Sequence, residues 1–493
     1  MLEQVDLETR RSKEDYKAQA AKLQQELAVL GQEIRTAKLP VIILFEGWGA
    51  AGKGSLIAKL IANFDPRGFK VYANAAPEEF ERRRPMLWRY WQQLPERGQM
   101  AVLDRSWYQE ISVRRLEENL SREEVQSRMN SIQRMERQWT DDGYLILKFF
   151  LHISQKEQRA RFDKLAEDKN TRWRVTELDR RRNREYERYA KVFDEMLEST
   201  NTPNAPWHVL ACHDKYGARL ELFRLVRDGI RDALARQEKE RPREIQTLGA
   251  GTFQLLPMPT LGEVPLDQRL EKEQYKKKLD RLQRELSDLH NELYRKKVPV
   301  IIGYEGWDAA GKGGNIKRVT AALDPRGYEV IPIAAPSKEE LAHQYLWRFW
   351  NHLPKTGHIA IFDRTWYGRV MVERIEGFCS PEDWHRAYRE INEFEQELWR
   401  WGAVILKFWL QIDPDEQLTR FRDRENTPEK RWKLTEEDWR NREKWPAYEE
   451  AVNDMLRYTS TEFAPWHIIS SQDKRYGRIQ ALSVIVEQLK RRL

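Results

Sequence analysis

The chain has 493 residues with 40% hydrophobic and 33% charged side chains, a globular composition long enough for two or more domains. Nineteen tryptophans exclude a disordered chain, and the two cysteines, Cys212 and Cys379, exclude a disulfide framework or a thiolate metal cluster. The net charge of +7 suits polyanionic ligands such as nucleotides, nucleic acid or phosphate chains, but it fits an ordinary solvated surface equally well. Met1–Lys38 lacks a signal-peptide core and no apolar run is long enough to span a bilayer, so we expect a cytoplasmic protein without a membrane partner.

An internal repeat organises the chain. Gly47 recurs 259 residues later as Gly306, each followed by Trp, and Asp65–Gly68 and Asp324–Gly327 share one sequence at the same offset. A constant offset over much of the chain indicates the gapless duplication of a whole domain. Between the copies lies a stretch rich in glycine and proline, which is typical of a linker. We therefore expect domains over residues 1–236 and 266–493, joined by a linker over residues 237–265.

Each copy opens on a segment with helical periodicity. Its apolar residues follow a 4-3-4 spacing, which places them on one face of a helix that is otherwise charged. Such a stripe is more typical of packing within a domain than of a coiled-coil partner, and we expect the former. The residues are Leu23, Leu27, Leu30 and Ile34 in the first copy and Leu282, Leu286, Leu289 and Leu293 in the second.

Short apolar runs then alternate with longer helical patterns. In the second copy we predict buried strands at Val298–Tyr304, Ile359–Phe362 and Val404–Ile412, and a helix at Pro381–Arg400. Strands that alternate with helices favour a parallel sheet covered on both faces. The predicted fold class is α/β, with one such domain in each copy.

The first of these strands leads into a phosphate-binding motif, G-x-x-x-x-G-K, which a helical stretch follows. Glycines in such a loop let backbone N–H groups turn toward phosphate oxygens, and the helix N-terminus adds its positive dipole end. The lysine would neutralise charge on the transferred phosphoryl group. A glycine-rich turn with an incidental lysine is the weaker alternative, because the motif has the right context and occurs in both copies. The predicted phosphate-binding residues are Gly306, Ala309, Ala310, Gly311, Lys312, Gly313 and Gly314.

The loop departs from the ordinary P-loop at one position. Gly313 stands where a Ser or Thr usually follows the Lys and holds Mg²⁺, so the metal needs another ligand. Asp308 offers a hard oxygen donor beside the phosphates and is our candidate. The first copy keeps the glycines and Lys53 but has Gly49 at the position of Asp308, so a carboxylate is missing there.

A second acid follows the strand predicted at Ile359–Phe362. In P-loop enzymes an Asp at this place is a further anchor for Mg²⁺, which points to Asp363. The adjacent Arg364 suits a bidentate contact with phosphate. A buried Asp–Arg pair that closes the strand is the alternative.

The first copy keeps this Asp–Arg pair but differs just beyond it. Arg369 is matched there by Glu110, and Glu373 is matched by Arg114. We interpret these charge reversals, together with the missing loop carboxylate, as signs that the first copy is catalytically degenerate.

A basic segment lies late in the second copy. From Arg420 onward arginines and lysines surround Trp432, and a helix rich in Trp and Arg follows. In a P-loop kinase a mobile basic segment at this place can close over the phosphates and exclude water, whereas the alternative is a solvated helix face. We predict that Lys430, Arg431 and Lys433 bind phosphate. The first copy has a similar segment, so it would still bind phosphate.

With these motifs the chain resembles the polyphosphate kinase 2 family, in its two-domain form. The likeness rests on the loop Gly306–Gly314 with its Asp and paired glycines, on the Asp-Arg-Thr-Trp-Tyr sequence of Asp363–Tyr367, and on the lid region Lys430–Thr435. It covers both copies and therefore most of the chain outside the linker.

The resemblance implies a thymidylate-kinase-like fold with a helical lid, Mg²⁺ as cofactor and inorganic polyphosphate as phosphoryl donor. It implies that Asp308 and Asp363 serve the metal, that Lys312 is the loop lysine, and that Arg364 and Arg369 meet phosphate. Two-domain members typically phosphorylate AMP, whereas single-domain members often act on nucleoside diphosphates. A homodimer is expected from the resemblance alone, and nucleic acid is not expected as a partner.

The predicted activity is Mg²⁺-dependent transfer of the terminal phosphoryl group of polyphosphate to AMP, giving ADP. Its catalytic residues would be Asp308, Lys312, Asp363 and Arg364 of the second copy. Three alternatives remain: an ATP-dependent nucleotide kinase, a member that phosphorylates nucleoside diphosphates such as ADP or GDP, and a non-catalytic protein that binds polyphosphate or nucleic acid. The intact set of loop and strand-end residues argues against the last. The base pocket of the acceptor cannot be placed, because aromatic residues are too abundant.

Overall fold

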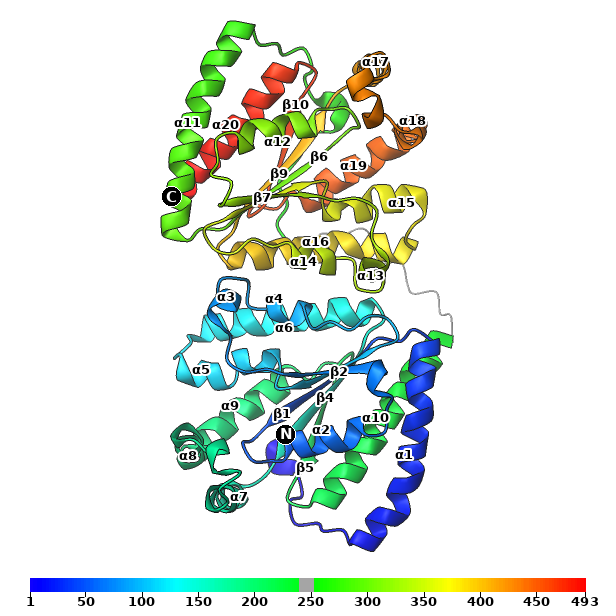
Figure 1. Cartoon of the computed structure of the whole chain (residues 1–493), viewed down its shortest axis with the longest axis vertical. Coiled ribbons are helices and arrows are strands. Elements are labelled where there is room, and N and C mark those ends of the chain that lie inside the picture. Colours follow the sequence, from blue (N-terminus) through cyan, green and yellow to red (C-terminus); the bar gives the residue numbers. More distant parts are fainter. Residues whose placement is uncertain (239–251) are drawn as a thin grey trace. The chain divides into compact units, whose positions relative to one another are not determined.

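The computed structural model describes residues 1–238 and 252–493, apart from the side chains of Glu238, Lys430 and Lys433. The chain divides into two compact units, of which the first contains strands β1–β5 and the second contains strands β6–β10 (Figure 1). Each unit is an α/β structure on a five-stranded parallel sheet, which confirms the predicted fold class and the tandem duplication. No helix among the described residues is both long and apolar enough to cross a membrane.

The elements follow one another in nearly the same order in the two halves of the chain. In the first half they are η1 (Leu2–Gln4), α1 (Lys13–Thr36), β1 (Val41–Gly47), α2 (Lys53–Ile61), η2 (Pro66–Gly68), β2 (Phe69–Ala73), α3 (Glu79–Arg82), α4 (Trp88–Trp91), β3 (Met100–Asp104), η3 (Trp107–Glu110), α5 (Val113–Glu117), α6 (Arg122–Asp141), β4 (Leu145–His152), α7 (Gln155–Glu167), η4 (Arg172–Arg174), α8 (Glu177–Arg184), α9 (Tyr186–Ser199), β5 (Trp207–Ala211) and α10 (Lys215–Glu238). In the second half they are η5 (Leu261–Glu263), α11 (Lys272–Lys296), β6 (Val300–Gly306), α12 (Lys312–Thr320), β7 (Tyr328–Pro332), α13 (Lys338–Leu341), α14 (Trp347–Asn351), β8 (Ile359–Asp363), η6 (Trp366–Val370), α15 (Val372–Glu376), α16 (Pro381–Arg400), β9 (Val404–Gln411), α17 (Pro414–Glu425), η7 (Pro428–Lys433), α18 (Glu436–Glu443), α19 (Trp445–Thr459), β10 (Trp466–Ser470) and α20 (Lys474–Arg492).

Both sheets have the same strand order. It is β2-β3-β1-β4-β5 in the first unit, and the second unit repeats it as β7-β8-β6-β9-β10. Helices cover both faces of each sheet: α6 and α10 pack on β4, and α16 and α20 pack on β9 (Figure 1). Because all strands are parallel, their carboxyl ends share one edge, where ligands bind in sheets of this kind.

Apolar runs form the central strands. The three strands predicted in the second copy are β6, β8 and β9, each within two residues of its expected ends, and their side chains are almost all buried. Burial on both faces explains why these strands are continuously apolar rather than alternating. The edge strand β7 was not predicted, because three of its five residues are exposed and its sequence lacks such a run.

The helix predicted at Pro381–Arg400 is α16, with the same ends. Its start is fixed by a capping box, in which the Ser380 side chain accepts from the Asp383 N–H and the Asp383 carboxylate accepts from the Ser380 N–H. Proline at the first helical position adds to this signal. These local features explain why the sequence located this helix so well.

The apolar stripes at the start of each copy are buried against their own unit. α1 packs on α10, and α11 packs on α20. This arrangement confirms the prediction of internal packing over a coiled-coil partner. The buried side chains are those of Leu23, Leu27, Leu30, Ile34, Leu282, Leu286, Leu289 and Leu293.

Part of the predicted linker, residues 252–265, is packed on the second unit. The Leu256 N–H donates to the Ser460 carbonyl at 2.7 Å, and the Leu261 N–H donates to the Asn453 side chain at 2.9 Å. Leu261 is itself buried, and η5 rests on α19. Residues 239–251 lie outside the described residues, and the domain boundaries at 236 and 266 stay a prediction.

A tryptophan in each phosphate loop is held by the last residue of a neighbouring strand. In the first unit Trp48 Nε1 donates to His152 Nδ1 at 3.1 Å, and in the second Trp307 Nε1 donates to Gln411 Oε1 at 2.9 Å. Burial, with a smaller effect from nearby His213, lowers the pKa of His152 from 6.5 to about 4. The first unit therefore carries a titratable group at a contact where the second carries an amide.

We predict that mild acid destabilises the first unit through His152. Between pH 6.5 and pH 4 the unfolded chain binds a proton that the folded unit does not, so the free energy of unfolding falls as the pH falls. The loss from pH 7.5 to pH 5 is about 2 kcal/mol. His152→Gln copies the second unit and should remove this loss. Hydrogen exchange of peptides from β1 and β4, corrected for intrinsic rates, measures it, and peptides from β6 and β9 serve as the internal control. An acid dependence that persists in the variant would contradict the prediction.

Candidate active site

The phosphate loop of the second unit begins at Gly306, a position that no other amino acid could occupy. Gly306 has φ +149°, and a Cβ on it would lie 2.7 Å from the Leu410 carbonyl oxygen of β9. At the other end Gly311 has φ +111° and caps α12. Between them Ala309 holds a left-handed φ of 64°, a strained conformation that persists only where its surroundings fix it.

Arg420 on α17 supplies part of that fixation. Its guanidinium donates to the carbonyls of Ala309 and Ala310, both at 3.0 Å, and to the Ser471 carbonyl at 2.7 Å. The side chain is buried and pairs with Glu416 at 2.6 Å. The sequence placed Arg420 at the start of a basic lid. In the structure it instead holds the phosphate loop through hydrogen bonds to the loop carbonyls.

Lys312 and Asp363 lie at the loop and at the end of the neighbouring strand. Lys312 Nζ donates to the Gly306 carbonyl at 2.6 Å and to the Trp307 carbonyl at 3.4 Å, so it lies along the loop. Asp363 ends β8 directly opposite Tyr304 of β6. Its carboxylate makes no hydrogen bond or ion pair with any described residue, and it is therefore available to a ligand.

Asp308 is oriented from three sides. Arg364 Nη2 lies 3.4 Å from Asp308 Oδ1, and Asn441 Nδ2 on α18 donates to Oδ2 at 3.1 Å. Gln417 on α17 donates to the Asp308 backbone carbonyl at 3.1 Å. Arg364 has a left-handed φ of 68°, and its N–H bonds to the Tyr304 carbonyl at 3.0 Å. The structure thus brings two predicted residues, Asp308 and Arg364, into contact.

These residues open on one cavity that is continuous with solvent. Asp308, Lys312 and Arg364 contribute charged groups to its lining, and its apolar and aromatic surface comes from Trp307, Met371, Val372, Trp409 and Tyr448. Such a combination suits a ligand with a phosphate at one end and a flat ring at the other. The lining residues are Glu305, Gly306, Trp307, Asp308, Lys312, Arg364, Gly368, Met371, Val372, Trp409, Gln417, Glu437, Asn441 and Tyr448.

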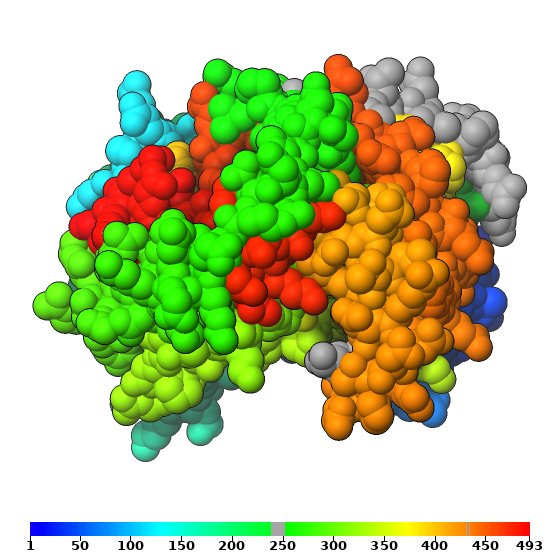
Figure 2. Space-filling model, turned by 90° about the horizontal axis from the view of Figure 1, so that it is seen from above, coloured from blue at the N-terminus to red at the C-terminus, as the bar shows by residue number. Residues whose placement is uncertain are grey.

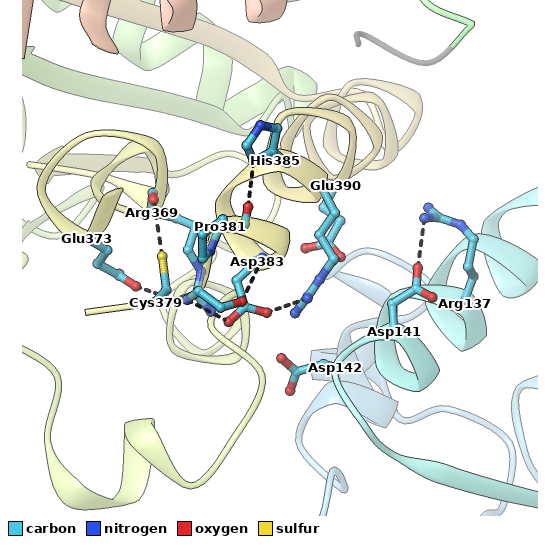
Figure 3. A network of polar contacts seen from close by, with 12 residues as sticks. Arg137, Asp141, Asp142, Arg369, Glu373, Cys379, Pro381, Asp383, His385 and Glu390 are labelled. Atoms are coloured by element: carbon cyan, nitrogen blue, oxygen red, sulfur yellow. Dashed lines mark hydrogen bonds and ion pairs between the residues drawn. The ribbon is translucent and has the colours of Figure 1, made fainter. Parts of the chain in front are cut away.

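Arg369, predicted to bind phosphate, does not line this cavity. Its guanidinium lies 4.4 Å from the centre of the Tyr345 ring and pairs with Glu373 (Figure 3). In the first unit Arg114 pairs with Glu110 at 2.8 Å, so the two charges have exchanged places along the chain. The charge reversals thus preserve an ion pair, and the catalytic degeneracy of the first copy stays a prediction.

Of the predicted lid contacts, Arg431 is described by the structure and does not line the cavity. Arg431 is exposed, and its Nε donates to the Glu425 carbonyl at 2.7 Å. The side chains of Lys430 and Lys433 lie outside the described residues. The segment that contains α17, η7 and α18, orange in Figure 2, forms an outer wall of the second unit. Phosphate binding by these three residues stays a prediction.

The first unit repeats the loop but not the side chains around it. A Cβ on Gly49 would lie 3.1 Å from the Phe162 ring, so that ring takes the space where the second unit has a carboxylate. The corresponding Phe421 instead packs edge-on against Trp439, with ring centres 5.2 Å apart. Arg182 stands where the second unit has Asn441 and pairs with Glu117. The loop carboxylate and its amide partner are therefore both absent from this unit.

Sequence reasoning missed the residues that come from α18 and α19. Asn441 orients Asp308, and Tyr448 forms part of the cavity wall. One signal was available for Asn441, because the repeat aligns it with Arg182 and so marks a position where the copies differ. Gly368, aligned with Gln109, carries the same signal.

The donor set fits a hard divalent cation. Mg²⁺ in kinases is held by one or two carboxylates together with substrate phosphates and water, and Asp308 and Asp363 are carboxylates of that kind. No cluster of three or more His, Cys, Asp or Glu side chains forms a ready-made metal site in the part of the chain that the structure describes. A metal here would therefore depend on substrate oxygens for the rest of its coordination.

Comparison with known proteins shows which family the chain belongs to. The polyphosphate kinase 2 family model matches residues 10–240 and 269–493, so the chain belongs to that family, as the sequence motifs predicted. A polyphosphate:AMP phosphotransferase of Pseudomonas aeruginosa is 40% identical over 98% of both chains, and one of Acinetobacter johnsonii is 36% identical over 95% of this chain and 94% of its own. A crystal structure assigned to polyphosphate kinase 2 from P. aeruginosa superposes with a TM-score of 0.86 at 38% identity, covering 100% of this chain and 99% of that one.

A relative named for another acceptor matches a smaller share of the chain. An ADP-polyphosphate phosphotransferase of P. aeruginosa is 41% identical over 45% of this chain and 72% of its own length. The two relatives described above that align along nearly the whole chain are both named for AMP.

We predict that Arg420 holds the phosphate loop in shape. Arg420→Gln leaves loop carbonyls without a buried partner, which should lower the stability of the second unit by on the order of 3 kcal/mol and speed hydrogen exchange across residues 306–314. Arg161→Gln removes the matching contacts with Ala50 and Ala51 and should speed hydrogen exchange at residues 47–55 alone. Arg422→Gln, at an exposed position on the same helix, is the control. Unchanged exchange at residues 306–314 in the Arg420 variant would contradict this role.

Proposed function

We propose that this chain transfers the terminal phosphoryl group of inorganic polyphosphate to AMP, giving ADP and a polyphosphate shortened by one unit. Family membership and the names of full-length relatives support a polyphosphate-dependent phosphotransferase. One observation carries the assignment of the chemistry to the second unit. Asp308, Lys312 and Arg364 line a single cavity there, whereas Gly49 leaves the first unit without the loop carboxylate.

In this mechanism an oxygen of the AMP phosphate attacks the terminal phosphorus of polyphosphate. A new P–O bond forms to AMP as the bond to the penultimate phosphate breaks. Lys312 and Arg364 stabilise the charge that spreads over the transferred group, and the loop N–H groups hold the donor. Mg²⁺, held by Asp308 and Asp363, would neutralise the phosphate oxygens when bound. The acceptor phosphate is already ionised at neutral pH, so no general base is needed.

The cavity also suggests where the nucleoside lies. Trp409, Tyr448 and Met371 line the same cavity, and their apolar surfaces suit stacking of a base. Arg364 would then face the AMP phosphate. We propose this cavity as the acceptor pocket, which the sequence could not place.

Several predictions from the sequence remain part of this proposal. Lys430, Arg431 and Lys433 are phosphate contacts that closure of the lid segment would have to bring toward the substrate, and Arg369 on η6 is a further phosphate contact. The domains span residues 1–236 and 266–493, and the first is catalytically degenerate. The protein is cytoplasmic, forms a homodimer, and has no nucleic acid or membrane partner.

We predict that the two carboxylates of the second unit are essential. Asp308→Gly, which copies the first unit, and Asp363→Ala should each lower kcat/KM by on the order of 10³-fold, because charge on the phosphoryl oxygens is no longer neutralised. Asp104→Ala, the matching change in the first unit, should leave turnover within about twofold. Steady-state rates with polyphosphate and AMP measure this. Comparable losses from Asp104 and Asp363 variants would mean that both units are active.

Product analysis tests the proposed reaction itself. Purified protein is incubated with Mg²⁺ and each pairing of donor (polyphosphate or ATP) with acceptor (AMP or ADP), and nucleotides are resolved by chromatography. ADP formed from AMP and polyphosphate is the expected result. ATP formed only from ADP would indicate a nucleoside diphosphate acceptor, and product formed only with ATP as donor would indicate an ordinary nucleotide kinase.

A further inference from the structure

Glu305 is a buried carboxylate in the cavity that the mechanism above does not use. It precedes the loop glycine, is 4% exposed and lines the cavity of the second unit. Its Oε1 accepts from the Thr365 N–H at 2.7 Å and from Thr365 Oγ1 at 2.8 Å. Its Oε2 accepts no hydrogen bond from the described residues. One oxygen is thus held by the protein while the other is left without a donor.

The first unit satisfies both oxygens of the matching residue. Glu46 Oε1 accepts from the Ser106 N–H at 2.7 Å and from Ser106 Oγ at 2.8 Å, which repeats the geometry of the second unit. Glu46 Oε2 accepts from Gln109 Nε2 at 2.5 Å. Gly368 takes the place of Gln109 in the second unit, so this amide is missing there.

Packing does not require a glycine at position 368. A Cβ added to Gly368 would meet no atom within 4 Å, and its φ is one that any residue adopts. The glycine is therefore compatible with a functional role: because it has no side chain, it leaves Glu305 Oε2 open to the cavity. Glu305 Oε2 faces a cavity that is continuous with solvent, so water or a bound molecule can donate to it, whereas in the first unit the Gln109 amide does so.

We infer that Glu305 is a positioning residue whose Oε2 accepts a hydrogen bond from an O–H group of the bound substrates. The inference rests on the proposed function. Two sources have this chemistry in the cavity: a ribose hydroxyl of AMP and a water molecule bound to the divalent metal. Burial raises the pKa of Glu305, and the nearby Lys312 and Arg364 act in the opposite direction and favour the charged, accepting form of the carboxylate. In the first unit the Gln109 amide occupies the same oxygen and would exclude either donor.

Glu305→Gln changes only the group that faces the cavity. The Thr365 N–H requires an acceptor, so the amide oxygen stays on that side and the NH₂ group faces the cavity. The new NH₂ group then faces the O–H group of the ligand, so two hydrogen-bond donors meet while the shape of the side chain stays the same. We expect kcat/KM to fall roughly 10- to 100-fold, with the melting temperature within about 2 °C of the wild type. Glu46→Gln is the matched control in the first unit, and its kcat/KM should stay within about twofold.

The two sources give different signatures. If a ribose hydroxyl is the donor, KM for AMP rises in Glu305→Gln. The kcat/KM of the wild type should then fall by a similar factor when 2′-deoxy- or 3′-deoxy-AMP replaces AMP, whereas the kcat/KM of the variant should not fall. If metal-bound water is the donor, the half-saturating Mg²⁺ concentration rises and KM for AMP is unchanged. KM for polyphosphate should stay constant in the first case.

Gly368→Gln tests the same hydrogen bond from the other side. The new amide should cap Glu305 Oε2 as Gln109 caps Glu46, and it should add little to the loss already caused by Glu305→Gln. Gly368→Met has the same length without an amide and measures the effect of volume alone. We expect kcat/KM of Gly368→Gln to be at least fivefold lower than kcat/KM of Gly368→Met.

The outcomes separate this inference from the proposed function. A wild-type chain that forms no ADP from AMP and polyphosphate would overturn the function, and this inference with it. An active wild type with Glu305→Gln unchanged in KM for AMP, metal dependence and kcat would overturn the inference alone. Activity lost only in proportion to a lower melting temperature would assign Glu305 a structural role and would also overturn it.

Discussion

The close approach of Gly306 to strand β9 is the contact on which the rest of the site depends. Because a Cβ at this position would lie 2.7 Å from the Leu410 carbonyl, the chain leaves β6 in a direction that only glycine permits. The loop that follows is tied to Arg420, and its N–H groups and Lys312 converge on the carboxyl edge of the sheet. Gly47 and Arg161 repeat this construction in the first unit, so the duplicated scaffold has been kept in both.

The units differ in what surrounds that common scaffold. In the first unit polar side chains near the loop are satisfied by other side chains: Arg182 pairs with Glu117, and Gln109 bonds to Glu46. In the second unit the matching positions are Asn441, which orients Asp308, and Gly368, which leaves space. Both units therefore have a cavity beside the loop, and the two cavities differ in the polar groups that line them. This contrast is the physical basis for assigning the chemistry to the second unit.

The sequence predicted those parts of the structure that local signals determine. The central strands, α16 and the phosphate loop were located because burial, capping and glycine spacing act over a few residues. The cavity wall was not, because Asn441 and Tyr448 reach the loop from more than 130 residues further along the chain. The contacts of Arg369 were not predicted for a related reason: Tyr345 and Glu373 hold its side chain, and no pattern in the sequence marks those contacts. Phosphate binding by Arg369 stays a prediction.

The most direct test of the account is a map of where AMP binds. Hydrogen exchange of the whole chain, with Mg²⁺ and with or without AMP, reports on both phosphate loops in one experiment. The account predicts AMP-dependent protection of residues 306–314 and 437–448 and no AMP-dependent change at residues 47–55. Equal protection of both loops by AMP would show that the first unit also holds the acceptor, and would contradict the assignment of the chemistry to the second unit alone.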